Sequence, residues 1–143
     1  MYTLSHLPAQ DLVEVVTRGD LDADAFFEMI GKTRDLCAQT DATRVLVDHS
    51  RASVGGVPHE GIRAVADYCT LLNRVLAGGR LAVVLIADLD YGLGRVWLSY
   101  AEEMLAYESR LFRNRREAEL WLLASRAKDP GDGGDTVPGG GSS

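Results

Sequence analysis

The sequence has few cysteines, no long hydrophobic run and fewer basic than acidic residues. Its two cysteines, Cys37 and Cys69, are too few for a disulfide scaffold, and neither has a close partner at the spacing of a zinc site. The longest strongly apolar stretch, Leu81 to Ala87, is far shorter than the roughly 20 residues that cross a bilayer. We therefore expect neither a disulfide-rich scaffold nor a transmembrane segment.

The charge balance is acidic. Lys and Arg number 15 against 21 Asp and Glu, which gives a formal net charge of −6 at pH 7. Such a charge repels a phosphate backbone at long range, so we expect no nucleic-acid partner. The first residues lack the basic and apolar segments of a secretory signal, and together with the scarcity of cysteine this favours a cytoplasmic location.

The last residues differ in composition from the rest of the chain. Residues 127–143 are rich in Gly, Pro and Ser and contain one large apolar residue, Val137. Such a segment cannot bury enough apolar surface to offset the entropy lost on ordering it. We expect one folded domain over residues 1–126 and a disordered tail over residues 127–143.

Within the domain, the hydrophobic pattern predicts strands that alternate with helices. The expected strands lie near residues 2–7, 12–18, 44–48, 81–87 and 109–112. The expected helices begin near Asp22, Pro58, Asp88 and Asn114. The resulting order, β-β-α-β-α-β-α-β-α, requires crossover connections. The predicted fold class is therefore α/β, with a central mixed β-sheet and about four helices.

Several of these segments together resemble the STAS-like domains, specifically the SpoIIAA-like branch of small proteins. They are the step Gly19 to Asp22 before the first helix, the apolar strands 44–48 and 81–86, and the ending Leu111 to Leu122, where Phe112 precedes polar residues, Glu-Ala and Trp-Leu. The resemblance covers about the whole folded unit, and it implies a STAS-like, SpoIIAA-like fold.

The resemblance also implies where a switch would lie. In the anti-sigma antagonist members of the wider family, an Asp-Ser-Ser-Gly segment presents a phosphorylatable serine at a helix N-terminus. The corresponding stretch here, residues 48–58, has Gly55-Gly56-Val57-Pro58 where the serine should lie. Because these residues carry no hydroxyl group, we predict no phosphorylation switch at this loop.

Polar residues gather after two of the predicted strands. They are Asp48, His49, Ser50, Asp88, Asp90 and Tyr91. Ligands of open α/β sheets bind outside the carboxyl ends of the strands, so these residues form the predicted ligand-binding edge. The three carboxylates can also be read in two other ways. They can hold a cation or exchange a proton, or they can simply end strands and cap a helix.

No catalytic constellation stands at diagnostic spacing. Neither Ser50 nor Ser53 lies in a nucleophile elbow, and His6, His49 and His59 lack the spacing of a zinc site. We therefore predict no catalytic residue, metal or cofactor. The favoured hypothesis is a non-enzymatic regulatory or binding module that acts through protein-protein or small-ligand contacts. The alternative is a small hydrolase or metal-assisted enzyme that uses Asp48, Asp88 and Asp90.

Apolar residues in the last two helices indicate an interface. Leu120 to Leu123 are consecutive and cannot all face one side of a helix, and exposed Trp and Leu commonly mark an interface. We predict a homodimer, with a regulatory protein or a small apolar or anionic ligand as a further partner. The expected interface residues are Trp97, Tyr100, Met104, Trp121 and Leu122.

A basic cluster near the C-terminus contrasts with the acidic chain. It consists of Arg110, Arg113, Arg115, Arg116 and Arg126. Arginines in such a cluster can contact an anionic group or an acidic partner. We favour the simpler interpretation that they form a solvated face.

Overall fold

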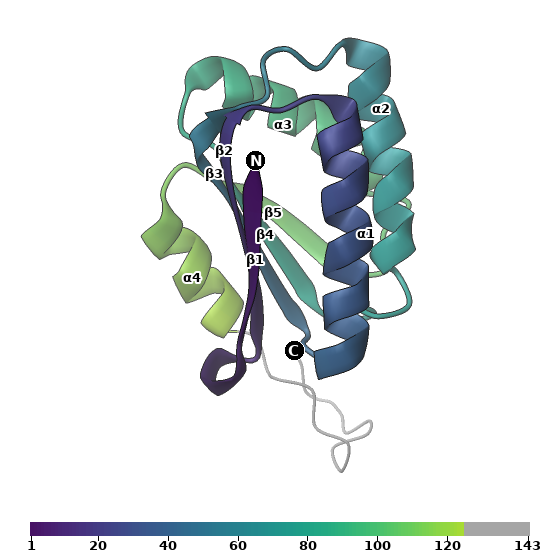
Figure 1. Cartoon of the computed structure of the whole chain (residues 1–143), viewed down its shortest axis with the longest axis vertical. Helices are drawn as coiled ribbons and strands as arrows, with labels where there is room; N and C mark the ends of the chain where they lie inside the picture. The colour runs from purple at the N-terminus through teal and green to yellow at the C-terminus, as the bar shows by residue number, and fades with distance from the viewer. Residues whose placement is uncertain (125–143) are drawn as a thin grey trace.

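A five-stranded sheet lies at the centre of the structure, with helices on both of its faces (Figure 1). The computed structural model describes residues 1–124, so the predicted tail 127–143 lies outside the described residues. The strands are β1 (Tyr2–Leu7), β2 (Leu12–Asp20), β3 (Arg44–Ser53), β4 (Arg80–Val84) and β5 (Glu108–Phe112). Their order in the sheet follows the chain, with β1 antiparallel to β2 and all other neighbours parallel. The predicted mixed sheet is confirmed.

The helices follow the strands in the predicted order. They are α1 (Ala23–Thr40), α2 (His59–Tyr68), α3 (Asp88–Ala101) and α4 (Arg115–Leu123), with two short 3-10 helices, η1 (Pro8–Gln10) and η2 (Cys69–Leu72). Asp22 caps α1 by accepting a hydrogen bond of 2.8 Å from the Ala25 amide. Asn114 caps α4 in the same way, with 2.8 Å to the Glu117 amide. Both predicted caps are confirmed.

β4 is shorter than the sequence predicts. The apolar run to Ala87 suggested a strand over residues 81–87, but β4 ends at Val84. Its neighbour β5 ends at Phe112, whose carbonyl accepts a hydrogen bond of 2.9 Å from the Leu85 amide. The chain then leaves the sheet, and Ile86 is 47% exposed. The apolar sequence therefore extends beyond the last residue of β4 that bonds to the neighbouring strand β5.

Two helices also end earlier than predicted. The apolar face from Ile62 to Leu76 suggested one helix, but α2 ends at Tyr68 and the tighter η2 follows. Leu76 remains fully buried, so the apolar face continues without the α-helical geometry. In the third helix the apolar residues recur at helical spacing as far as Leu105, which predicts a longer helix, yet α3 ends at Ala101.

The two faces of the sheet carry separate hydrophobic cores. Side chains alternate between the faces along a strand, so Val45 and Val47 face α1, α2 and α3, whereas Leu46 faces α4. The core on the α4 face consists of Leu12, Leu46, Ala82, Val84, Ala118 and Leu122. Within residues 1–124, no helix has both the length and the apolar character to cross a membrane.

Candidate functional site

The six residues of the predicted ligand-binding edge occupy separate environments. Asp48 and His49 are neighbours on β3, and the pleat points them to opposite faces of the sheet. Asp48 contacts α4, whereas His49 contacts the N-terminal part of α1. Ser50, the next residue of β3, is exposed, and its amide bonds to Asp48. Asp88, Asp90 and Tyr91, on α3, contact loops at the end of the sheet. The residues therefore do not form one shared site.

Asp48 is a buried carboxylate with two hydrogen-bond donors. Its Oδ1 accepts a hydrogen bond of 2.9 Å from the Ser50 amide, and its Oδ2 accepts one of 3.1 Å from Arg115 Nη1. Burial by itself raises the pKa of Asp48, but the bonds to Ser50 and Arg115 outweigh it and lower the pKa overall. Asp48 is therefore held as an anion, and its oxygens are already engaged.

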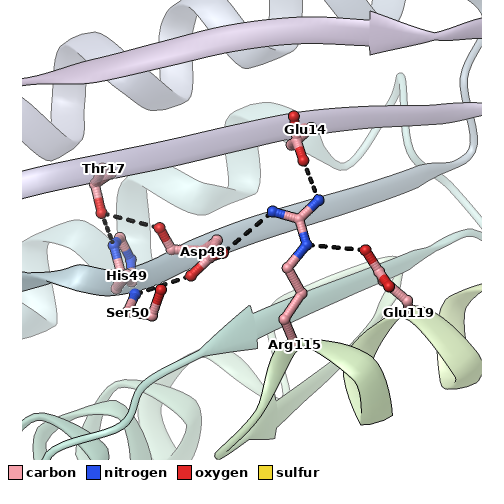
Figure 2. A network of polar contacts seen from close by, with 7 residues as sticks. All are labelled: Glu14, Thr17, Asp48, His49, Ser50, Arg115 and Glu119. Carbon is pink, nitrogen blue, oxygen red and sulfur yellow. Dashed lines mark hydrogen bonds and ion pairs between the residues drawn. The ribbon is translucent and has the colours of Figure 1, made fainter.

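Arg115 bonds to three carboxylates, two of which, on β2 and β3, connect α4 to the sheet (Figure 2). Besides Asp48, its guanidinium group bonds to Glu14 on β2 and to Glu119 one turn along α4, the latter at 2.9 Å. Burial alone lowers the pKa of Arg115, but these three carboxylates raise it well above its ordinary value. The prediction of a solvated face is wrong for Arg115. We call Glu14, Asp48, Arg115 and Glu119 the arginine clamp.

His49 is a buried, neutral imidazole on the opposite face. Its Nδ1 lies 2.6 Å from the Thr17 hydroxyl (Figure 2). Its ring meets the Phe26 ring edge-on at a centroid distance of 5.5 Å. Burial lowers the pKa of His49 to about 4, although the nearby Asp48 charge acts in the opposite direction. At pH 7 this side chain therefore carries no charge.

The acidic residues of α3 have structural partners of their own. Asp88 is exposed and forms an ion pair of 2.5 Å with Arg113, whose guanidinium group also lies 4.3 Å from the centroid of the Tyr91 ring. Asp90 is buried, and its Oδ1 accepts a hydrogen bond of 3.2 Å from the Val54 amide. This bond joins α3 to the loop after β3.

The three aspartates thus point to different partners. No group of three or more His, Cys, Asp or Glu side chains within residues 1–124 is arranged to hold a metal ion. General acid-base chemistry by Asp48, Asp88 and Asp90 needs side chains that converge on one substrate. The geometry therefore gives no support to the hydrolase or metal-assisted alternative.

The predicted interface residues of α4 are packed within the monomer. Leu122 is fully buried, so the prediction that it forms an interface is wrong. Trp121 packs against the Phe112 ring at 5.6 Å between centroids, and the Arg80 guanidinium group lies 4.6 Å from its ring. The exposed leucines of α4 are instead Leu120, at 59%, and Leu123, at 43%. The sequence indicated that some leucines must be exposed, but not which ones.

The remaining predicted interface residues lie on or just after α3. Trp97 and Met104 are half-buried. The hydroxyl group of Tyr100 lies 2.5 Å from His59 Nε2, and this contact joins α3 to α2. Trp97 and Tyr100 therefore take part in packing within the monomer.

Three features escaped the sequence prediction. The first is the arginine clamp, for which Glu14 is a usable signal because it is the one charged residue in the apolar run Leu12 to Val16. The second is the exposure of Leu89, at 65%, beside that of Ile86. The third is a cavity of about 100 Å³ between the sheet and α1, α2 and α3. Nothing in the hydrophobic pattern signals this cavity.

Three solved structures have a similar fold. SpoIIAA in its unphosphorylated form, an anti-sigma factor antagonist, matches with a TM-score of 0.57 at 14% identity over 88% of this chain and 100% of that chain. The phosphorylated form of SpoIIAA, a Bacillus cell fate determinant, matches with a TM-score of 0.51 at 16% identity over 82% of this chain and 96% of that chain.

The third is an uncharacterized DUF3478 family protein with a SpoIIAA-like fold from Shewanella loihica PV-4. It matches with a TM-score of 0.53 at 16% identity over 85% of this chain and 92% of that chain. No protein-family model matches the sequence, and no curated protein matches it. The chain therefore has the STAS-like, SpoIIAA-like fold that the sequence resemblance predicted.

Proposed function

We propose that this protein is a non-enzymatic regulatory module that binds another protein through one edge of its sheet. The proposed contact surface consists of Gly55, Gly56, Ile86 and Leu89, which we call the docking edge. It lies where the chain leaves the carboxyl ends of β3 and β4. This is the end of an open α/β sheet at which ligands and partners usually bind.

The observation that carries the proposal is the exposure of Leu89. This side chain is 65% exposed, and Ile86, three residues earlier, is 47% exposed. Leu89 also packs closely on the loop after β3, because a Cβ atom at Gly55 would lie 3.0 Å from its Cδ2. Two large exposed apolar side chains beside a glycine loop offer an apolar surface that a partner protein can cover.

The rim of the docking edge is charged. The ion pair between Asp88 and Arg113 lies at its border, and Arg113 Nη1 also donates a hydrogen bond of 3.4 Å to the Ile86 carbonyl. A polar rim around apolar anchors is the usual anatomy of a protein interface. The edge is therefore suited to a partner with an apolar centre and polar surroundings.

The comparison with SpoIIAA supports the choice of edge. SpoIIAA is by its description an anti-sigma factor antagonist, so its function is exerted on another protein. In that family the phosphorylatable serine lies on the loop after the strand that corresponds to β3. Here that loop has Gly55-Gly56-Val57-Pro58. We therefore propose that this protein uses the same edge for contacts without serine phosphorylation as its switch.

Site-specific crosslinking tests the docking edge. A photoreactive amino acid at position 89 should crosslink a distinct partner in the native host, whereas the same group at position 68, on α2, should not. Once the partner is identified, Leu89→Ser should weaken its binding at least tenfold. The control variant Tyr68→Ser removes another exposed large side chain, on α2 and outside both proposed contact surfaces, and should leave the affinity unchanged. Equal crosslinking from both positions would contradict the proposal.

We also propose that the protein forms a homodimer in the cytoplasm. The exposed Leu120 and Leu123 of α4 supply an apolar surface for a second copy, and a twofold arrangement is the commonest closed symmetry. The buried free thiols of Cys37 and Cys69 are compatible with a reducing compartment. Sedimentation at micromolar concentration should show a dimer that Leu120→Asp dissociates; a monomer before the substitution would contradict this proposal.

A further inference from the structure

A cavity lies between the sheet and the helices α1, α2 and α3. It has a volume of about 100 Å³, is partly open to solvent, and is lined from the sheet by Val45, Val47 and Val83 and from α1, α2 and α3 by larger side chains. Three of these, Phe26, Leu93 and Trp97, are only half-buried. They stand between the cavity and the solvent.

The exposure of two strand residues agrees with this cavity. Val47 and Val83 each keep 8% exposure, although β3 and β4 are interior strands of the sheet. Leu46 and Val84, their neighbours on the opposite face, are fully buried. Because Val47 and Val83 line the cavity, their residual accessible surface faces it.

The lining of the cavity is almost wholly apolar. No Asp, Glu, Lys or Arg side chain of residues 1–124 lines it, and the His49 imidazole in its lining is buried. Thr33 and His49 in the lining have partners, since Thr33 donates a hydrogen bond of 2.8 Å to the Met29 carbonyl and His49 Nδ1 lies 2.6 Å from the Thr17 hydroxyl. An ion that entered the cavity would lose its hydration without gaining a counter-charge, so the lining selects against charged molecules.

We propose that this cavity is a binding site for a small uncharged apolar molecule, with a monocyclic aromatic or a short hydrocarbon chain as its chemical class. An apolar cavity of about 150 Å³ stays dry and takes benzene or xenon, and the present cavity approaches that size while opening to solvent. The inference goes beyond the docking edge and stands on the cavity alone.

The loop after β3 connects the cavity to the protein surface. Val54 and Val57 are buried and line the cavity, whereas Gly55 and Gly56 between them are exposed. A ligand that contacts the two valines therefore changes the surroundings of the loop itself. The amides of Gly55 and Gly56 report on the occupancy of the cavity.

Titration of the isolated protein with toluene and with benzoate tests the site, because the two molecules share a ring and differ in charge. Toluene should shift the methyl resonances of Val47, Val54 and Val83 saturably, with a Kd on the order of 0.1–1 mM. It should also move the amides of Gly55 and Gly56 and raise Tm by several degrees at high saturation. Benzoate should bind at least tenfold more weakly.

Two substitutions on adjacent residues of β4 provide matched variants. Val83→Ile adds a methylene group to the cavity and should weaken toluene binding at least fivefold, whereas Val84→Ile adds it to the α4 face and should leave toluene affinity unchanged. Val47→Ile is a second cavity-filling variant, and circular dichroism checks that each variant folds. Absence of saturable toluene shifts, equal binding of benzoate, or unchanged affinity in both filled variants would overturn the inference. Because no partner is present, none of these results bears on the docking edge.

Discussion

On the α4 face of the sheet, the six core side chains have exposures between 0% and 3%, whereas on the opposite face Val47 and Val83 keep 8% and border a cavity. The closely packed face is covered by one helix of nine residues, and the looser face by three helices. The amount of helix that covers a face therefore does not decide how closely it is packed.

The difference arises from how the helices are attached. α4 is tied to β2 and β3 by the arginine clamp and to β4 by Arg80, whose Nη1 donates a hydrogen bond of 2.8 Å to the Trp121 carbonyl. On the other face, short valine side chains on the central strands meet α1, α2 and α3 through mainly apolar contacts, and these leave space. Directional contacts fix a short helix at close range, whereas apolar contacts tolerate a gap.

The largest expected effect comes from removing the clamp. Arg115→Met should lower the free energy of unfolding by about 3 kcal/mol, because it leaves the buried Asp48 without its cation. The estimate is at the low end for a buried ion pair, since the Arg115 side chain is 34% exposed. Urea denaturation measures the loss, and the exposed neighbour Arg116 supplies a control, since Arg116→Met should change stability by less than about 0.5 kcal/mol. A loss below about 1 kcal/mol would mean that apolar contacts alone hold α4.

The second largest expected effect is a pH dependence of the free energy of unfolding, which arises from His49 on the face toward α1, α2 and α3. The pKa of His49 is about 4 in the folded protein against an ordinary value of 6.5, so the unfolded chain takes up a proton first as the pH falls. The free energy of unfolding should therefore decrease by about 2 kcal/mol between pH 7 and pH 5. In His49→Asn this component should disappear, and the pH profile over that range should flatten. Equal slopes for both proteins would show that His49 is not buried as a neutral group.

The smallest expected change in stability tests most directly whether the two faces of the sheet are packed differently. Val84→Ile overfills the packed face and should destabilise the protein by about 1 kcal/mol or slightly more. Val83→Ile, one residue earlier, enters the cavity and should be neutral or stabilise by up to about 1 kcal/mol. Thermal and urea unfolding of the two variants give the difference directly. Equal destabilisation by both would mean that the two faces are packed alike.

The alternation of side chains along a strand already predicts which of the candidate site residues share a face of the sheet. The period of two along β3 already places Asp48 and His49 on opposite faces, so their position at one strand end does not make them a shared site. Asp90 was interpreted as a helix cap or a ligand, yet it bonds to the Val54 amide, which is 36 residues away. Such a partner follows from how α3 and the loop after β3 pack together, and no local pattern indicates it.

The sequence by itself determined the order of strands and helices, the caps at Asp22 and Asn114, and the lack of a hydroxyl group at Gly55 to Pro58. These properties depend on neighbouring residues, through hydrophobic periodicity and hydrogen bonds within a turn.

Only the tertiary structure decided the partners of Arg115, which lie 67 and 101 residues away at Asp48 and Glu14. It also decided the cavity, because an empty volume is the difference between the space that packed elements enclose and the side chains that fill it. The enclosed space depends on the positions of whole helices, which the sequence pattern does not give. The valines of β3 and β4 predict buried strands whether or not a cavity lies beside them.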